Sequence, residues 1–268
     1  MNLPEEAIAK SCCADLYQSD LARMILGDTL HPGGMALTNR LGRMMGIQPG
    51  DWVADLACGR GTSAMAVSRA FHCKVVGIEF GSGAAAEARA SALEAPIRSE
   101  TFFVRGDAEQ PPLRSSVIDA VLCECSMSIF PDKPSAVKQV KGVLRPGGRF
   151  GLSDVTVEPG SLPQGLNNVV GQVLCLADAL SVAGYENLLT HGGMKLQHQE
   201  DASDEIINLL DDLAGKLGMI LAWQKVSQPT LAADQDWLRD APDLITEVRQ
   251  LVTDGKLGYW LFVAEKPA

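Results

Sequence analysis

The chain has 268 residues, of which 46% are hydrophobic and 21% charged, which is typical of a globular protein with an ample core. Its 33 acidic and 23 basic residues give a formal charge of -10, and no basic stripe is present that would bind nucleic acid, so we expect a small-molecule substrate and no nucleic-acid partner. No apolar run is long enough to cross a bilayer, and the first ten residues lack the apolar core of a secretory signal, so we expect a cytoplasmic protein with no membrane partner.

The cysteine count agrees with a reducing compartment. The chain contains 7 cysteines, an odd number, and none forms the CxxC pair that is typical of structural zinc. We therefore expect thiols rather than a disulfide framework. We interpret Cys58 and Cys73 as structural and consider the other five below.

Residues 1–48 are predicted to form an N-terminal helical cap. Within it, Met35 to Met45 has the apolar spacing of an amphipathic helix. His31 lies immediately before Pro32-Gly33-Gly34, where a histidine is more often a turn residue than a site residue. We favour the turn interpretation over a role in lining a site.

A short apolar run, Trp52 to Ala54, predicts the first strand, and the stretch from Asp55 to Gly61 follows it. The next ten residues, Thr62 to Phe71, have helical spacing. The glycines therefore lie where a strand turns into a helix. Gly59 and Gly61 allow a tight turn and the close approach of a ligand, toward which the first helical N–H groups would point.

Two acidic residues sharpen this motif. Val75 to Glu79 predicts a second strand, and a carboxylate at its end can accept both hydroxyls of a ribose. A third strand, Thr101 to Val104, is followed by Asp107, where an adenine amino group can donate to the carboxylate. A nicotinamide dehydrogenase usually carries a third glycine where Ala64 stands, so this alternative is disfavoured without being excluded.

Strand and helix patterns alternate from Asp51 to Val155, which predicts an α/β fold: a doubly wound, mostly parallel sheet with helices on both faces. The remaining elements expected in this region are helices at Gly81 to Ala95 and Ser135 to Leu144, and strands at Ile118 to Leu122 and Phe150 to Val155.

This ordered succession closely resembles the class I S-adenosylmethionine (SAM) methyltransferases over roughly Gly50 to Val155. The resemblance implies SAM as cofactor and a Rossmann-like sheet of seven strands, whose last strand, Tyr259 to Ala264, runs antiparallel. The residues expected to bind the cofactor are Asp55, Ala57, Gly59, Gly61, Glu79, Asp107, Ala108 and Glu124.

The second half of the chain is less regular. We expect a helix from Leu166 to Val182, with Cys175 roughly opposite its apolar stripe, a strand from Met194 to Gln199, and helices at Asp204 to Leu217 and Leu244 to Thr253. Residues 219–238 have no clear period. The predicted organisation is thus a cap (1–48), a SAM-binding core (49–155), a lid segment over the site (156–193) and a C-terminal part that completes the sheet (194–268).

Cysteines from three segments are candidates for one thiol site. Cys123 and Cys125 follow the fourth strand, and Glu124 between them suggests that the strand has already ended, because a carboxylate is costly inside a buried sheet. Cys175 lies in the predicted lid, and Cys12-Cys13 opens the cap. Three soft thiolates would form a pyramidal site for As(III), whose lone pair could attack the sulfonium methyl in line without a general base.

Three stretches resemble the arsenite methyltransferases: Cys12-Cys13, Cys123 to Lys133, and Leu174 to Leu180. The resemblance implies Cys125 and Cys175 as catalytic thiolates that bind As(III), assisted by Cys12 or Cys13, and a thiol reductant such as glutathione or thioredoxin. Three positions depart from the family. Ala64 replaces a further cysteine, Cys123-Glu124 replaces Ser-Asn, and Ala177-Asp178 replaces two glycines.

Three hypotheses therefore follow from the sequence. The first is a SAM-dependent methyltransferase that acts on thiolate-bound arsenite or methylarsenite. The second is a SAM-dependent methyltransferase for a small organic acceptor, such as a quinone or a natural-product carbon or oxygen. The third is a non-catalytic metalloid-binding protein on the same fold, which requires that SAM not bind.

Overall fold

The computed structural model describes residues 31–97, 99–163, 176, 178–227 and 237–268. Its centre is one sheet with the strand order β3-β2-β1-β4-β5-β7-β6. Strands β1 to β5 are parallel, and β7 runs antiparallel to both of its neighbours, β5 and β6. The strands are β1 (Trp52–Leu56), β2 (Lys74–Glu79), β3 (Thr101–Arg105), β4 (Ile118–Glu124), β5 (Leu144–Val157), β6 (Lys195–Asp201) and β7 (Leu257–Glu265).

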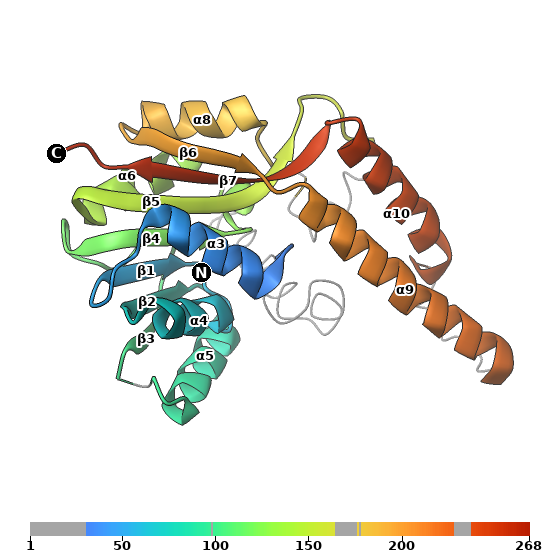
Figure 1. The fold of residues 1–268 in the computed structure, drawn as a ribbon, viewed down its shortest axis with the longest axis horizontal. Helices are drawn as coiled ribbons and strands as arrows, with labels where there is room; N and C mark the ends of the chain where they lie inside the picture. The colour runs from blue at the N-terminus through green and yellow to red at the C-terminus, as the bar shows by residue number, and fades with distance from the viewer. Residues whose placement is uncertain (1–30, 98, 164–175, 177, 228–236) are drawn as a thin grey trace, which may run out of the picture.

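Helices cover both faces of the sheet (Figure 1). The helices of the described residues are α3 (Gly34–Met45), α4 (Thr62–Phe71), α5 (Ser82–Glu94), the short 3₁₀ helix η1 (Met127–Ile129), α6 (Lys133–Val143), α8 (Val182–His191), α9 (Asp204–Ser227) and α10 (Trp237–Thr253). Helices α3, α4 and α5 pack on one face, and α6 and α8 pack on the other. Helices α9 and α10 lie side by side and extend beyond the sheet.

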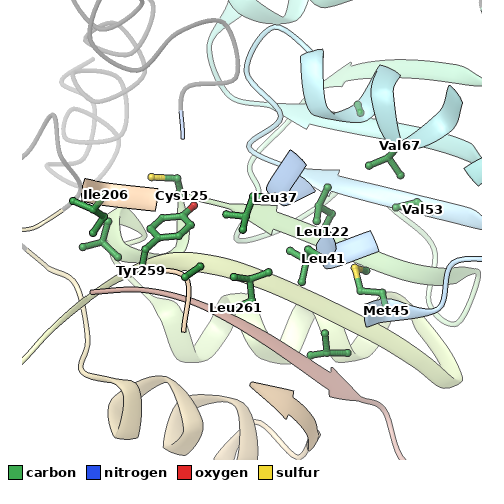
Figure 2. Close-up of a cluster of buried hydrophobic side chains, with 14 of the residues drawn as sticks. Leu37, Leu41, Met45, Val53, Val67, Leu122, Cys125, Ile206, Tyr259 and Leu261 are labelled. Carbon is green, nitrogen blue, oxygen red and sulfur yellow. The ribbon is translucent and has the colours of Figure 1, made fainter. Parts of the chain in front are cut away.

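Two buried clusters hold these layers together, because successive side chains of each strand point to opposite faces. On the α3 face, Leu41 of α3 and Val67 of α4 pack with Leu122, Tyr259 and Leu261 of the sheet (Figure 2). The cluster on the opposite face joins the apolar sides of α6 and α8 to the alternate positions of the same strands. The central strands are therefore buried on both faces, as expected for parallel strands, whereas the outer strands β3 and β6 are partly exposed.

The predicted fold class is confirmed: the sheet has seven strands, is mostly parallel, and carries helices on both faces. The strand order reverses between β1 and β4, because β2 and β3 lie on one side of β1 and the later strands lie on the other. Ligands of open α/β sheets bind at the carboxyl ends of the strands at such a reversal. This edge carries the glycine turn and Glu124.

Three sequence-based assignments need correction. Strand β4 continues through Cys123 and Glu124 rather than ending before them, because the Glu124 carboxylate finds polar partners at the edge of the sheet. The helix expected up to Val182 does not include residues 178–181, which are turn and coil; its residues 164–175 and 177 lie outside the described part. A helix that was not expected, α8, begins instead after Ser181, whose side chain accepts the N–H of Gly184.

The segment predicted as a lid, residues 156–193, has described parts in two different places of the fold. Val157 still belongs to β5, whereas α8 packs against β6 and α6 on a face of the sheet. In the described part of the chain, no helix is both long and apolar enough to cross a lipid bilayer.

Candidate active site

The glycine turn joins β1 to α4 through residues with left-handed backbone. Gly59 has φ 54° and Gly61 has φ 76°, a region that glycine enters without steric cost. Gly61 must also be small, because a Cβ there would collide with the Phe103 ring. Ala57 adopts φ 55° in the same turn, so this one position holds an alanine in a conformation that favours glycine.

Glu79 lies at the end of β2 and stabilises this turn. One of its oxygens accepts the N–H of Gly59 at 2.9 Å, and the other accepts the N–H of Gly81 at 2.6 Å. Burial raises the pKa of Glu79, while these two N–H donors lower it. The carboxylate is thus fixed between the glycine turn and the first turn of α5, beside the point where the sheet order reverses.

The loop after β3 is held by its own acidic residues. The Asp107 carboxylate accepts the N–H of Glu109 at 2.9 Å, which closes a tight turn around the buried Ala108. The buried Glu109 carboxylate in turn accepts the N–H of Asp132, the residue that caps α6. The predicted cofactor residues Asp107 and Ala108 therefore lie on a rigid loop next to Glu79, since the N–H of Gly106 donates to the Glu79 carbonyl.

Asp55, at the end of β1, is only 3% exposed. Burial raises its pKa well above the ordinary range, and the neighbouring carboxylates of Glu124 and Glu79 raise it further. Its Oδ2 atom has no hydrogen-bond partner among the described residues. A buried acid with an open oxygen, close to two other carboxylates, favours a ligand that carries hydrogen-bond donors or positive charge.

Glu124, at the end of β4, is enclosed by three polar side chains. Thr38 of α3 donates its hydroxyl to the carboxylate, with distances of 3.0 and 3.1 Å to the two oxygens. The Nε2 atom of His31 lies 3.5 Å from the carboxylate, 3.2 Å from the Thr38 hydroxyl and 3.3 Å from the Ser63 hydroxyl. Ser63 belongs to the first turn of α4, directly after the glycine turn. The cap is thus joined to β4 and α4 by a buried polar cluster.

His31 is a turn residue, as interpreted, because its carbonyl accepts the N–H of Gly34 at 3.4 Å, but its side chain also has a role that this interpretation passed over. The side chain is 4% exposed and belongs to this cluster. The turn geometry of Pro32 to Gly34 is present as well, because Gly33 and Gly34 have positive φ. The inward orientation of the imidazole could not be predicted from sequence, since two of its partners, Ser63 and Glu124, are far from His31 in the chain.

Cys123 and Cys125 point to opposite sides of the sheet. Cys123 is fully buried in the cluster on the α6 face, which removes it from the candidates for the thiol site. Cys125 adopts φ 49°, and its N–H donates to the Ser153 carbonyl at 2.7 Å. Figure 2 shows its thiol beside the hydroxyl of Tyr259, which lies 3.2 Å from the Ser153 hydroxyl. Burial raises the pKa of Tyr259 well above its usual value, and the neighbouring Cys125 adds to this shift.

Asp154 of β5 is a second buried acid that sequence analysis did not select. Its carboxylate accepts the N–H of Ser128 at 2.8 Å and that of Val155 at 2.8 Å. Burial raises its pKa to about 6, although these hydrogen bonds and Lys133 oppose the shift. The available signal was an acid inside the otherwise apolar fifth strand, a position where a carboxylate needs specific partners.

The proposed thiol site cannot be assembled from the described residues. Cys12, Cys13 and Cys175 lie outside them, so of the four arsenic-ligand candidates only Cys125 has a described position. Among the described residues, no group of three or more His, Cys, Asp or Glu side chains is arranged to hold a metal ion.

Comparisons with known proteins agree with the fold described above. Residues 53–148 match the model of a methyltransferase domain. The chain is 28% identical over 201 residues to a 27-O-demethylrifamycin SV methyltransferase of Amycolatopsis mediterranei, which covers 69% of this chain and 73% of that protein.

Two solved structures are similar in fold. The cyclopropane synthase MmaA2 of Mycobacterium tuberculosis has a TM-score of 0.78 at 16% identity, covering 98% of this chain and 99% of the other. A phosphoethanolamine N-methyltransferase 2 of Haemonchus contortus in complex with SAM has a TM-score of 0.77 at 15% identity. The match to the latter covers 96% of this chain and 60% of that longer chain.

The fold is therefore that of the class I SAM-dependent methyltransferases, and residues 53–148 of this fold are similar to a methyltransferase domain. The cofactor of this fold is SAM. The residues present fit it: the buried carboxylates of Asp55, Glu79 and Glu124 surround the glycine turn at the switch point and favour a cationic ligand rich in donors.

Proposed function

We propose that this chain transfers the methyl group of SAM to a small organic acceptor, at an oxygen or carbon atom. The observation that carries the proposal is the position of Glu79 and Glu124 on the two sides of Asp55, at the ends of β2, β1 and β4. SAM carries a ribose at its centre and a positively charged methionine end. Carboxylates at these two positions are suited to both groups.

The cofactor residues would act as follows. Glu79 accepts hydrogen bonds from the ribose hydroxyls, and Asp107, with the adjacent Ala108 backbone, receives the adenine. The turn from Ala57 to Gly61 approaches the methionine part closely, and Glu124 attracts its ammonium group. Asp55 adds a buried carboxyl, whose Oδ2 atom has no partner among the described residues, between Glu79 and Glu124. SAM itself supplies an electrophilic methyl on sulfur, which the acceptor must approach in line.

An organic acceptor is supported by the comparison as well as by the described residues. The relative from Amycolatopsis mediterranei is named for a methyl transfer to an organic molecule, 27-O-demethylrifamycin SV. The side chains near Cys125 that the structure describes are largely apolar, and include Leu37 and Ile206. Such surroundings suit an apolar organic acceptor better than a small, strongly hydrated one.

Arsenite remains a second candidate because of the Cys125 thiol. The buried thiol lies at the end of β4, close to the proposed cofactor residue Glu124. A trivalent arsenic site needs at least one more thiolate, and the candidates Cys175, Cys12 and Cys13 come from the sequence resemblance alone. In that mechanism the thiolates hold arsenic while its lone pair attacks the methyl.

Calorimetry with SAM provides the first test. We expect the wild-type chain to bind SAM, and Glu79→Ala to weaken binding by about 100-fold, since two backbone N–H groups lose their acceptor along with the ribose. Glu94→Ala, at the exposed end of α5, is the matched control and should bind as the wild type does. Absence of SAM binding to the wild-type chain would favour the non-catalytic metalloid-binding hypothesis.

A second experiment distinguishes the acceptors. The purified chain is incubated with SAM carrying a labelled methyl group, either with a panel of phenols, quinols and macrocyclic alcohols or with arsenite and glutathione. We expect label in an organic product, and Cys125→Ser should retain that activity. Label in methylarsenic species, lost in Cys125→Ser and in Cys175→Ser, would instead support the arsenite hypothesis.

A further inference from the structure

A groove between α6 and α8 concentrates positive charge on a chain whose formal charge is -10. Among the residues that the structure describes, its lining includes no aspartate or glutamate. The basic residues that line it are Lys133, Lys138, Lys141, His191 and Lys266. The groove lies on the α6 face of the sheet, and none of the residues that line it surrounds the glycine turn.

The lysines differ in how far they are already engaged. Lys133 is close to the carboxylates of Asp178, Asp154 and Glu109, and Lys266 donates to the Leu144 carbonyl at 2.6 Å. In contrast, Lys138 and Lys141 form no ion pair with any described residue. They are three residues apart on α6, so they project from the same side of the helix. Two neighbouring lysines without an acidic partner favour an external anion.

The shape of the groove indicates what kind of anion it fits. Between the charged residues its lining is apolar or small, and includes Pro134, Leu180, Leu188 and Gly184. Sites for small molecules enclose most of their ligand, whereas this groove is open to solvent and is lined mainly by residues of two helices. From Lys133 to Lys141 the axis of α6 rises about 12 Å, which corresponds to about two turns of a third helix laid alongside.

We propose that the groove between α6 and α8 docks an acidic amphipathic helix of a partner protein. Leucine-like side chains of that helix would pack on Leu180 and Leu188, and carboxylates spaced three or four residues apart would pair with Lys138 and Lys141. Because the rest of the surface carries a net negative charge, an acidic partner is repelled elsewhere and attracted here, so the charge selects the docking face.

The test uses a displayed library of 16-residue helical peptides with random surface positions. Peptides are selected on the wild-type chain and counter-selected on K138E/K141E. We expect the enriched peptides to carry aspartate or glutamate at spacings of three or four beside leucine-like residues. They should bind K138E/K141E at least 10-fold more weakly than the wild type and lose affinity as salt increases. Amide shifts in NMR spectra should be confined to α6 and α8.

A matched control is K195E/K216E, which makes the same change in net charge on β6 and α9 and should bind the peptides as the wild type does. SAM affinity should be the same in the wild type and in K138E/K141E; if K138E/K141E does not fold, the neutral pair K138Q/K141Q replaces it. Enriched peptides without acidic bias, or with equal affinity for the charge-reversed chain, would contradict the proposal. So would pyrophosphate that shifts the same amides and displaces every selected peptide, because the groove would then be a small-anion site.

Discussion

The two halves of the strand edge are built in different ways. Around β1 and β2, the site depends on the backbone. The N–H groups of Gly59 and Gly81 donate to the Glu79 carboxylate, and Gly59 and Gly61 supply the left-handed turn, so the whole arrangement lies within 23 residues of chain, from 59 to 81. Around β4 and β5 it depends on buried side chains from distant segments. The contact between Thr38 and Glu124, for example, spans 86 residues of sequence.

This difference determines how each half responds to mutation. A site built from backbone is sensitive to substitution of its glycines for two reasons. An added Cβ can overlap a neighbouring side chain, and a residue with a Cβ is strained at positive φ. A side-chain-built site is sensitive to charge, because each buried carboxylate depends on a few donors. The four predictions below test this contrast, in order of decreasing effect.

Gly61→Ala should be the most destabilising change, by about 2–5 kcal/mol, because a left-handed backbone strain and an overlap with the Phe103 ring occur together. Urea unfolding monitored by circular dichroism measures the free energy of unfolding. Gly50→Ala is the matched control: Gly50 has φ 89° with open space around its Cβ position, so it should cost only the backbone strain, about 1–2 kcal/mol. Equal losses in the two variants would contradict the role of Phe103.

Asp154 should make stability depend on pH. Its pKa is raised in the folded state, from 3.8 to about 6, so the native state holds the proton more tightly than the unfolded chain does. The stabilisation is complete below the unfolded pKa and is lost as pH rises through about 6. The free energy of unfolding should therefore fall by about 3 kcal/mol from this group between about pH 3 and pH 8.

Urea unfolding at a series of pH values measures this fall, and Asp154→Asn should remove its largest part. Burial also raises the pKa values of Asp55 and Glu79, so some decline in the same direction will remain in that variant. Asp254→Asn is the control, because the exposed Asp254 has a lowered pKa and its removal should leave the decline in place. An unchanged pH profile in Asp154→Asn would show that Asp154 does not titrate as inferred.

Glu124→Gln should weaken SAM binding by about 10-fold in calorimetry, since the amide keeps the size of the side chain and its contact with Thr38 but loses the negative charge. Asp119→Asn removes a carboxylate from the opposite end of β4, where Asp119 accepts the N–H of Trp52. That variant has the same net charge and should bind SAM normally. Equal weakening in both would mean that total charge, rather than the position of Glu124, governs affinity.

Ala57→Gly should have the smallest effect, a stabilisation of at most about 1 kcal/mol. The gain comes from relief of the left-handed strain at φ 55°, and the greater flexibility of glycine in the unfolded chain offsets part of it. Thermal unfolding measures the shift. A clear loss of stability would indicate that the Ala57 methyl makes packing contacts that outweigh the strain.

The same contrast explains what could be predicted from sequence. The α/β fold, the helix from Thr62 to Phe71 and the glycine turn were all predictable, because periodicity and glycine chemistry act over a few neighbouring residues. The inward orientation of His31 was not, because it depends on Thr38, Ser63 and Glu124 meeting in three dimensions. The helix α8 was missed for a local reason. It begins after the cap residue Ser181, which lies inside the helix predicted from Leu166 to Val182, so the apolar pattern of that predicted helix hid the new start.

The buried acids at the strand ends have a consequence for turnover. In the proposed function SAM arrives with a positive charge on sulfur, and this charge favours the ionised form of Asp55, which burial otherwise opposes. Once the methyl group has left, the sulfur is a neutral thioether, and only the ammonium group, which stays on the spent cofactor, still offsets the acidic residues of this edge. Asp55 should then take up a proton more readily than it does beside SAM, so the chemical step itself resets the protonation of the edge before the next cycle.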